Sequence, residues 1–182
     1  MLSRRAGAAL GMAGVVTAGA VWLGAGGASA GSGNQELGWP GRPVTSMAEV
    51  QRMSAAAARG DDSTLIVVTR AVRGAGVDVG AKGESPGDFF VFEEKVFDNT
   101  RTEKIGRDAV RCEAGLRTFT CEATIRINGR GKIRVAGTLF RPTDNIVPVT
   151  GGTQNFRGVG GSLTVYDLRN GNAALVFDLV KP

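Results

Sequence analysis

The sequence predicts an all-β protein, a single eight-stranded antiparallel β-barrel, and three observations lead to this fold class. From Ser63 onward apolar residues recur at every second position, which is the period of a β-strand. About eight such runs follow at short spacing with no helical run between them, as is typical of an antiparallel barrel or sandwich. The glycine-rich stretch 145–168 lies within strands, which favours a small closed barrel and argues against a nucleotide-binding turn.

Residues 1–30 are predicted to be a secretory signal peptide. Arg4 and Arg5 precede the apolar run 6–23, and Ala28-Ser29-Ala30 has the small residues of a cleavage site. A transmembrane anchor is the alternative, since the run is about long enough to span a bilayer. The glycines of the run and the polar residues that follow it favour cleavage. We therefore expect a secreted, extracellular protein with no stable membrane insertion, exported by the general secretory or the twin-arginine route.

A leader, residues 31–62, precedes the predicted barrel domain, residues 63–182. Its first part, 31–43, is rich in Gly, Pro, Ser and Asn and is expected to be mobile. Ser46 and Glu49 have the spacing of a capping box, so the alanine-rich segment 47–59 is predicted to form a short helix with few apolar residues to bury. No second domain or repeat is visible.

The predicted strands within the barrel domain are short and closely spaced. A long glycine-rich loop is expected at 74–87, and Gly129-Arg130-Gly131 and Asn170-Gly171 are typical of hairpin turns. The runs that predict strands are 64–72, 89–98, 104–112, 116–128, 132–141, 145–150, 154–159, 162–168 and 173–180.

The charge of the chain excludes little. The formal net charge is +5, and loss of the signal peptide with its two arginines would lower it to about +3. Because the basic residues are scattered along the sequence, we expect a mildly basic surface and no nucleic-acid partner. Outward residues such as Glu122, Thr124 and Arg134 predict an exterior ladder of mixed charge and not a site.

Several kinds of catalytic site are excluded by the residues present. The chain has no histidine, which excludes Ser-His-Asp and Cys-His nucleophiles and the usual zinc ligand sets. The segment 129–132 resembles a phosphate loop superficially, but Ile133 stands where Ser or Thr would reach magnesium. No carboxylate cluster has the spacing of a calcium loop. We expect neither a metal nor a cofactor.

The two cysteines of the chain, Cys112 and Cys121, fall on runs that predict neighbouring strands of a hairpin. In an exported protein such a pair predicts a disulfide. Two buried thiols, one of them facing a ligand, are the alternative.

Glu94 is the candidate catalytic residue. It shares one face of the strand 89–98 with Phe90 and Phe92, and a carboxylate among aromatic rings has a raised pKa, as a general acid or base at neutral pH requires. A strand turned by one face, with Glu94 in solvent, stays open because Glu93 and Lys95 break the pattern on the other face equally.

Five short motifs occur together in order, and they resemble those of allene oxide cyclases and the related dirigent proteins, which share an eight-stranded antiparallel barrel. The resemblance covers roughly Ser63 to the C-terminus. Its motifs are Gly87-Asp88, Ile105-Gly106-Arg107-Asp108 leading to Cys112, Glu122-Ala123-Thr124, the run 132–137 and the run 149–158 with Phe156.

The resemblance implies a cavity but not the plant reaction. Cys112 matches a cysteine that lines the family's cavity, and Glu94 takes the place of a cavity-facing asparagine, which favours the inward orientation. Leu139 replaces the pocket tyrosine, and the segment 66–70 contains no counterpart of the family's glutamate. Plant relatives form homotrimers, so a homo-oligomer is expected.

The function predicted from these features is that of a cofactor-independent cyclase or isomerase, or a dirigent-like stereochemical guide, for a small hydrophobic molecule. Confinement of the substrate would supply most of the rate. The alternatives are a non-catalytic carrier of a small hydrophobic ligand and a filled barrel that acts through its surface. The predicted pocket is lined by Phe90, Phe92, Cys112, Ala123, Ile125, Val135, Leu139 and Asp167.

Overall fold

The computed structural model describes residues 44–60, 63–80, 83–140, 145–168 and 172–181. The predicted signal peptide, the first part of the leader and the Asn170-Gly171 turn lie outside the described residues. Among the helices described, none is long and apolar enough to cross a bilayer.

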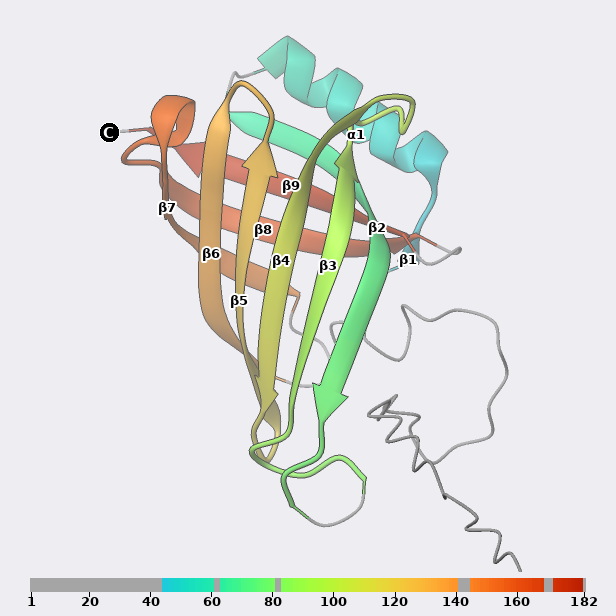
Figure 1. Ribbon diagram of the computed structural model, residues 1–182. Coiled ribbons are helices and arrows are strands. Elements are labelled where there is room, and N and C mark those ends of the chain that lie inside the picture. The colour runs from blue at the N-terminus through green and yellow to red at the C-terminus, as the bar shows by residue number, and fades with distance from the viewer. Residues whose placement is uncertain (1–43, 61–62, 81–82, 141–144, 169–171, 182) are drawn as a thin grey trace, which may run out of the picture.

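Eight antiparallel strands close into a barrel, which confirms the predicted fold class (Figure 1). Each strand pairs with the next along the chain, and the last pairs with the first to complete the circuit. A two-residue strand, β1 (Val44–Thr45), lies parallel to the end of β8. The barrel strands are β2 (Thr64–Val77), β3 (Phe89–Phe97), β4 (Lys104–Ala114), β5 (Thr118–Ile127), β6 (Gly131–Phe140), β7 (Ile146–Gly152), β8 (Gly160–Leu168) and β9 (Asn172–Val180).

The main core fills the inside of the barrel. On β4, β5 and β6 buried and exposed residues alternate strictly over most of each strand, because successive side chains point to opposite faces of a sheet. Each large apolar side chain placed inside contributes about 1.5–3 kcal/mol. The largest fully buried inner residues are Phe177, Ile125, Ile133, Leu139 and Leu163.

A helix, α1 (Met47–Gly60), covers the outer face of β2, β8 and β9 (Figure 1). Its Val50 is fully buried against Ile66 and Val68 of β2 and Leu168 of β8. This contact explains why β2 carries consecutive apolar residues at its start, since there both faces of the strand are covered. The helix begins after Ser46, whose Oγ accepts a 3.3 Å hydrogen bond from the backbone N–H of Glu49.

One predicted strand, 154–159, is wrong. Its first residues form a 3₁₀ helix, η1 (Gln154–Phe156), in which Gln154 has φ of 56°. Gly152 makes this tight path feasible, because a Cβ at that position would lie 2.5 Å from the Phe156 carbonyl oxygen. The result is that Phe156 packs into the barrel core with 2% of its surface exposed.

The predicted glycine-rich loop 74–87 starts too early, because β2 continues to Val77. Gly74 and Gly76 pair directly with Phe92 and Phe90 of β3, so small residues lie where the facing strand carries rings. The loop that follows is fastened by Asp88. Its carboxylate accepts hydrogen bonds from the N–H groups of Val79 (2.8 Å) and Ser85 (2.6 Å), which lower the pKa of Asp88 below its usual range.

Candidate functional site

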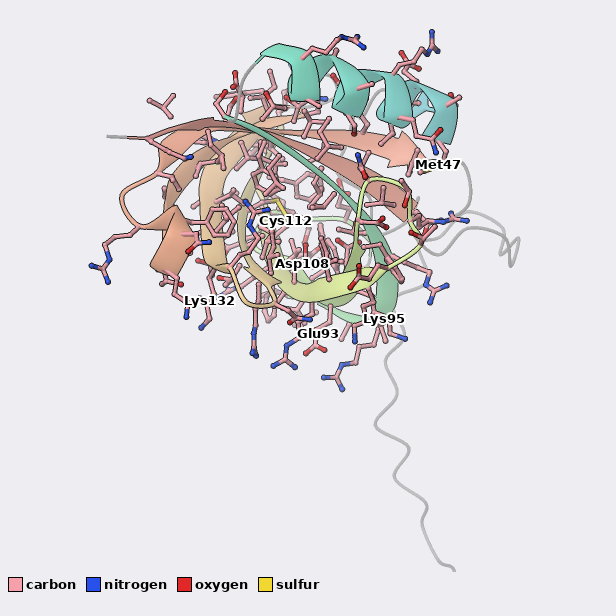
Figure 2. The ribbon with its side chains drawn as sticks, turned by 90° about the horizontal axis from the view of Figure 1, so that it is seen from above. Met47, Glu93, Lys95, Asp108, Cys112 and Lys132 are labelled. Atoms are coloured by element: carbon pink, nitrogen blue, oxygen red, sulfur yellow. A yellow bond between two sulfur atoms is a disulfide. The ribbon has the colours of Figure 1, made fainter. Side chains whose placement is uncertain are left out.

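Strands β3 and β4 place two carboxyl groups against each other inside the barrel. Glu94 and Asp108 are direct cross-strand partners, and they expose only 8% and 4% of their surfaces. Figure 2 shows Asp108 within the ring of strands, whereas Glu93 points outward. Glu94 therefore lies inside the barrel, and the orientation in which it is solvated is not observed. We refer to Glu94 and Asp108 as the carboxyl pair.

The carboxyl pair is set in apolar surroundings. Ala71 of β2 pairs with Glu94, and Ile125 of β5 pairs with Asp108. On the same inner face, two positions along each strand, lie the buried side chains of Phe92, Val96 and Val110. Water is therefore replaced by groups that cannot stabilise two negative charges.

The surroundings raise the pKa of Asp108 well above its usual range. Burial is the largest cause, and the negative charge of Glu94 and a hydrogen bond with the Glu94 side chain act in the same direction. A hydrogen bond between two carboxyl groups requires that one of them carries the proton. The pair thus titrates as a unit and keeps a proton at pH values where isolated carboxyl groups have lost theirs.

Two buried polar atoms near the carboxyl pair can each form a further hydrogen bond. Asp108 Oδ1 and Thr69 Oγ1 are both buried without a hydrogen-bond partner among the described residues. Thr69 pairs with Val96, two positions from Glu94 on the same inner face. Buried polar atoms of this kind are rare in folded proteins, and they mark a place where a ligand or water can bind.

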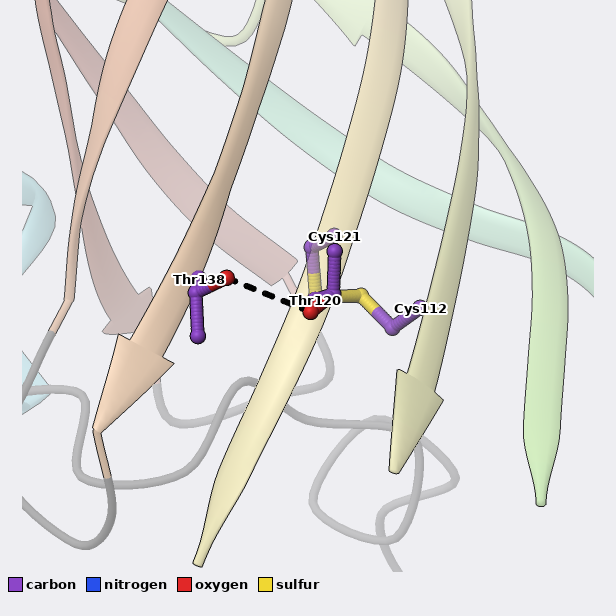
Figure 3. The surroundings of a disulfide bond; sticks show 4 residues. All are labelled: Cys112, Thr120, Cys121 and Thr138. Atoms are coloured by element: carbon purple, nitrogen blue, oxygen red, sulfur yellow. Dashed lines mark hydrogen bonds between the residues drawn. A yellow bond between two sulfur atoms is a disulfide. The ribbon is translucent and has the colours of Figure 1, made fainter. Parts of the chain in front are cut away.

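The cysteines form the predicted disulfide, Cys112–Cys121 (Figure 3). Both residues point into the barrel, and each exposes 1% of its surface. On the opposite face of β5, Thr120 and Thr138 share a 3.2 Å hydrogen bond. Because these are the two cysteines of the chain, the alternative of a buried thiol facing a ligand is wrong.

Most of the predicted pocket residues lie together in the inner core, and one lies apart. Phe90 is half-buried and contacts Phe119 edge to face, with ring centroids 5.7 Å apart. Asp167 is half-buried at the end of β8, where it pairs with Ala173 and Val44, far around the barrel from β3 and β4. The residues found together are Phe90, Phe92, Cys112, Ala123, Ile125, Val135 and Leu139.

The sequence prediction missed Asp108 as a site residue. A signal was present, because Asp108, Val110 and Cys112 alternate along one strand, and Cys112 was expected to face inward. Which residue of β4 stands beside Glu94 depends on the register between the strands, and that register could not be read from the sequence.

A cleft and a groove are lined by residues that the structure describes. A cleft of about 700 Å³ lies at one end of the barrel, between the second half of α1 and the inner residues Leu65, Phe156 and Leu179, and no Asp or Glu lines it within the described part of the chain. An outer groove of about 570 Å³ crosses strands β2 to β6. Glu122, Thr124 and Arg134 line this groove, so residues predicted to form only an exterior ladder border a concave surface.

No group of three potential metal ligands occurs in the described residues.

Comparison with known proteins identifies the fold. No family model and no curated protein match the chain. Pyocyanin demethylase is a similar solved structure, with 22% identity and a TM-score of 0.56 over 64% of this chain and 99% of that one. The chain shares its barrel.

Two cyclases have the same architecture. The Diels–Alderase AbmU from Streptomyces koyangensis is 11% identical, with a TM-score of 0.53 over 75% of this chain and 71% of that one. A heme-binding cyclase that catalyses a [4 + 2] cycloaddition in neoabyssomicin biosynthesis is 12% identical, with a TM-score of 0.54 over 82% of this chain and 80% of that one. At these identities the likeness extends to the fold alone.

Proposed function

We propose that the protein is a secreted isomerase or cyclase that acts on a small hydrophobic molecule by acid–base chemistry. The observation that carries the proposal is the carboxyl pair, in which Glu94 and Asp108 face each other, both buried, inside an apolar barrel. The barrels of similar fold, which are named as cyclases and a demethylase, support it. The signal-like N-terminal sequence and the disulfide support secretion.

The carboxyl pair supplies one proton donor and one proton acceptor. The protonated carboxyl group donates a hydrogen bond to an oxygen of the substrate, and the ionised one removes a proton from an adjacent carbon. The proton is then returned to a different carbon of the substrate. A double bond of the substrate has thereby changed position, and both carboxyl groups are back in their starting protonation states. Positioned proton transfer of this kind contributes roughly 10²–10⁴-fold in rate, and a confining barrel adds orientation.

The end cleft is the proposed route to the carboxyl pair. Along the inner face of β2, Leu65 lines the cleft, Val67 and Thr69 follow, and Ala71 pairs with Glu94. The Thr69 hydroxyl, buried without a partner among the described residues, therefore lies on this route. Phe156 lines the cleft and packs into the core, so an entering molecule has to displace its ring.

The proposal is tested with a small ketone, because the natural substrate is not needed to detect proton removal from carbon. The measurement is deuterium uptake from solvent at the acidic carbon of β-tetralone, followed by mass spectrometry. We expect Glu94→Gln and Asp108→Asn each to slow the protein-dependent exchange by roughly 10²-fold or more, while binding of a fluorescent apolar dye persists.

Glu93→Gln is the matched control, because it makes the same chemical change one residue away on the outer face. It removes an exposed ion pair with Arg73, which contributes little to stability because solvent screens it, and it should leave the exchange rate unchanged. Equal rates in wild type, Glu94→Gln and Asp108→Asn would remove the carboxyl pair from the chemistry.

A non-catalytic carrier is the second candidate, because no carboxyl group of the described residues lines the end cleft, whose polar lining includes Arg130, Asn155 and Lys181. A molecule held between α1 and Leu65 meets no acidic side chain from the described residues. Under this hypothesis the apolar dye binds, no exchange above the buffer rate occurs, and Leu65→Arg abolishes dye binding. Homotrimer formation stays a prediction from the family resemblance, and native mass spectrometry counts the subunits.

A further inference from the structure

Five basic residues stand in one row on the outer face of the barrel. They come from five consecutive strands, and in each case the register places one directly beside the next. This finding corrects the expectation that the basic residues are scattered. They are far apart in the sequence, but strand pairing places them side by side. The basic row consists of Arg70, Lys95, Arg107, Arg126 and Lys132.

The basic row is costly for the fold. Like charges directly opposite each other in a sheet are destabilising, and this row contains four such contacts in succession. Four of the five side chains are exposed and Lys95 is half-buried. Figure 2 shows Lys95 and Lys132 pointing away from the barrel on one outer face, with further nitrogen-tipped side chains between them.

Two acidic residues, Glu93 and Glu122, offset part of this charge, and both line the outer groove. Glu93, in the neighbouring row, binds Arg73 at 2.8 Å, and the pKa of Glu93 is lowered first by Arg73 and also by Arg107. The other members of the neighbouring row are Ala109, Thr124 and Arg134. Since Arg73, Arg111 and Arg134 line the groove against Glu93 and Glu122, the surface around the basic row remains cationic.

The shape of this face indicates a chain-like partner. The outer groove of about 570 Å³ runs beside the basic row across the same five strands, from Arg73 on β2 to Arg134 on β6. Five strands at the usual spacing make the row about 19 Å long. A flat bilayer does not follow a concave surface, whereas an extended polymer can lie in the groove with its negative charges against the row.

Two aromatic rings of this face, those of Phe89 and Phe97, are each covered by an arginine side chain. Arg70 lies over the ring of Phe97 at 5.4 Å, and Arg111 lies over the ring of Phe89 at 4.9 Å. Single-stranded nucleic acids are held largely by stacking on exposed rings. The groove instead presents small residues, Ala75 and Ala109, and the hydroxyl of Thr124, which suit a sugar chain.

We propose that the basic row and the outer groove together bind a linear acidic polysaccharide that lies across strands β2 to β6. The site is separate from the carboxyl pair, which faces the interior, and the proposal does not depend on the proposed function. Recognition rests on repeated negative charge, so affinity should fall steeply as salt is added.

The test uses the full chain and a fluorescently labelled heparin oligosaccharide, with Kd measured by anisotropy at several salt concentrations. The double variant Arg107→Gln, Arg126→Gln should bind roughly tenfold more weakly or worse, with a shallower salt dependence. The matched control Arg52→Gln, Arg117→Gln has the same net charge but changes exposed residues on α1 and before β5. It should bind within about twofold of wild type.

Thermal unfolding keeps the test independent of folding defects. Removing like-charge contacts should leave Tm of the Arg107, Arg126 variant equal to or above that of wild type, and Lys95→Gln with Lys132→Gln should weaken heparin binding in the same way. Equal losses in the row variants and the control would overturn the proposal. So would single-stranded DNA or anionic phospholipid vesicles that bind more tightly than heparin and displace it.

Discussion

The pKa values of two aspartates of this chain are shifted in opposite directions by their immediate surroundings. Asp108 is buried beside another carboxyl group, whereas Asp98 sits in a turn where N–H and O–H groups converge on it. The first environment disfavours the charged form and the second favours it. Each therefore predicts its own dependence of stability on pH.

In wild type the free energy of unfolding should fall as pH rises, and Asp108→Asn should abolish this fall. Because the pKa of Asp108 is raised in the folded state, the folded protein binds more protons than the unfolded chain above the ordinary carboxyl pKa of about 4. The free energy of unfolding of wild type therefore falls from about pH 4 up to the folded-state pKa. Urea unfolding at pH 4 to 8 should show the variant gaining on wild type with pH, and parallel curves would contradict this.

Asp98→Ala should show the reverse dependence. The Asp98 carboxylate accepts a hydrogen bond from the Thr100 hydroxyl, which is the largest cause of its lowered pKa of about 2. The N–H groups of Glu103 (3.0 Å) and Thr102 (2.7 Å) also donate to it. Its contribution is present above the unfolded-state pKa and is lost as pH falls through about 2. We expect a loss of about 1 kcal/mol at pH 7 that shrinks toward zero near pH 2, measured by urea unfolding.

At the level of strands and turns, alternation along the sequence was sufficient to place most of the barrel. The predicted runs correspond to β2 through β9, because one face of each strand packs inside and the two-residue period is preserved. The predicted strand boundaries are wrong at two places, where the backbone conformation determines the path of the chain. Gln154 has positive φ and turns the segment toward η1, and Gly74 and Gly76 continue β2 because phenylalanines face them.

A glycine pair at the start of β8 tests how closely the strands approach. Gly161 has φ of 113°, and a Cβ there would lie 2.0 Å from the Asp178 carbonyl oxygen, whereas the space around Gly160 is open. We expect Gly161→Ala to lower the free energy of unfolding by about 2 kcal/mol or more. Gly160→Ala, the matched control, should change it by less than about 1 kcal/mol. Similar values for the two variants in urea unfolding would contradict the close approach.

The disulfide joins β4 to β5 across one hairpin, at a sequence separation of 9. Closing so short a loop in the unfolded chain contributes about 2–3 kcal/mol. The double variant Cys112→Ala, Cys121→Ala should lose at least this amount in urea unfolding and keep the barrel's circular dichroism spectrum. A variant as stable as wild type would mean that the core repacks around the two alanines.

At the level of the whole molecule, the features that carry function arise from register between strands. Alternation left the orientation of Glu94 open and the family resemblance favoured the inward one, but only the alignment of β3 with β4 places Asp108 against Glu94. In the same way Arg70 and Lys95, 25 positions apart in the sequence, become neighbours in the sheet. Alternation therefore predicted the barrel, the family resemblance added one half of the carboxyl pair, and neither could predict the basic row.

The inward position of the Cys112–Cys121 bond has a kinetic consequence. Since each cysteine exposes 1% of its surface, a small thiol reductant reaches the sulfur atoms only while β4 and β5 are transiently separated from their neighbours. At low reductant the cleavage rate then scales with the population of that open form, and at high reductant it levels off at the rate of opening itself. The rate of disulfide cleavage therefore measures how often β4 and β5 separate from their neighbours, without any added label.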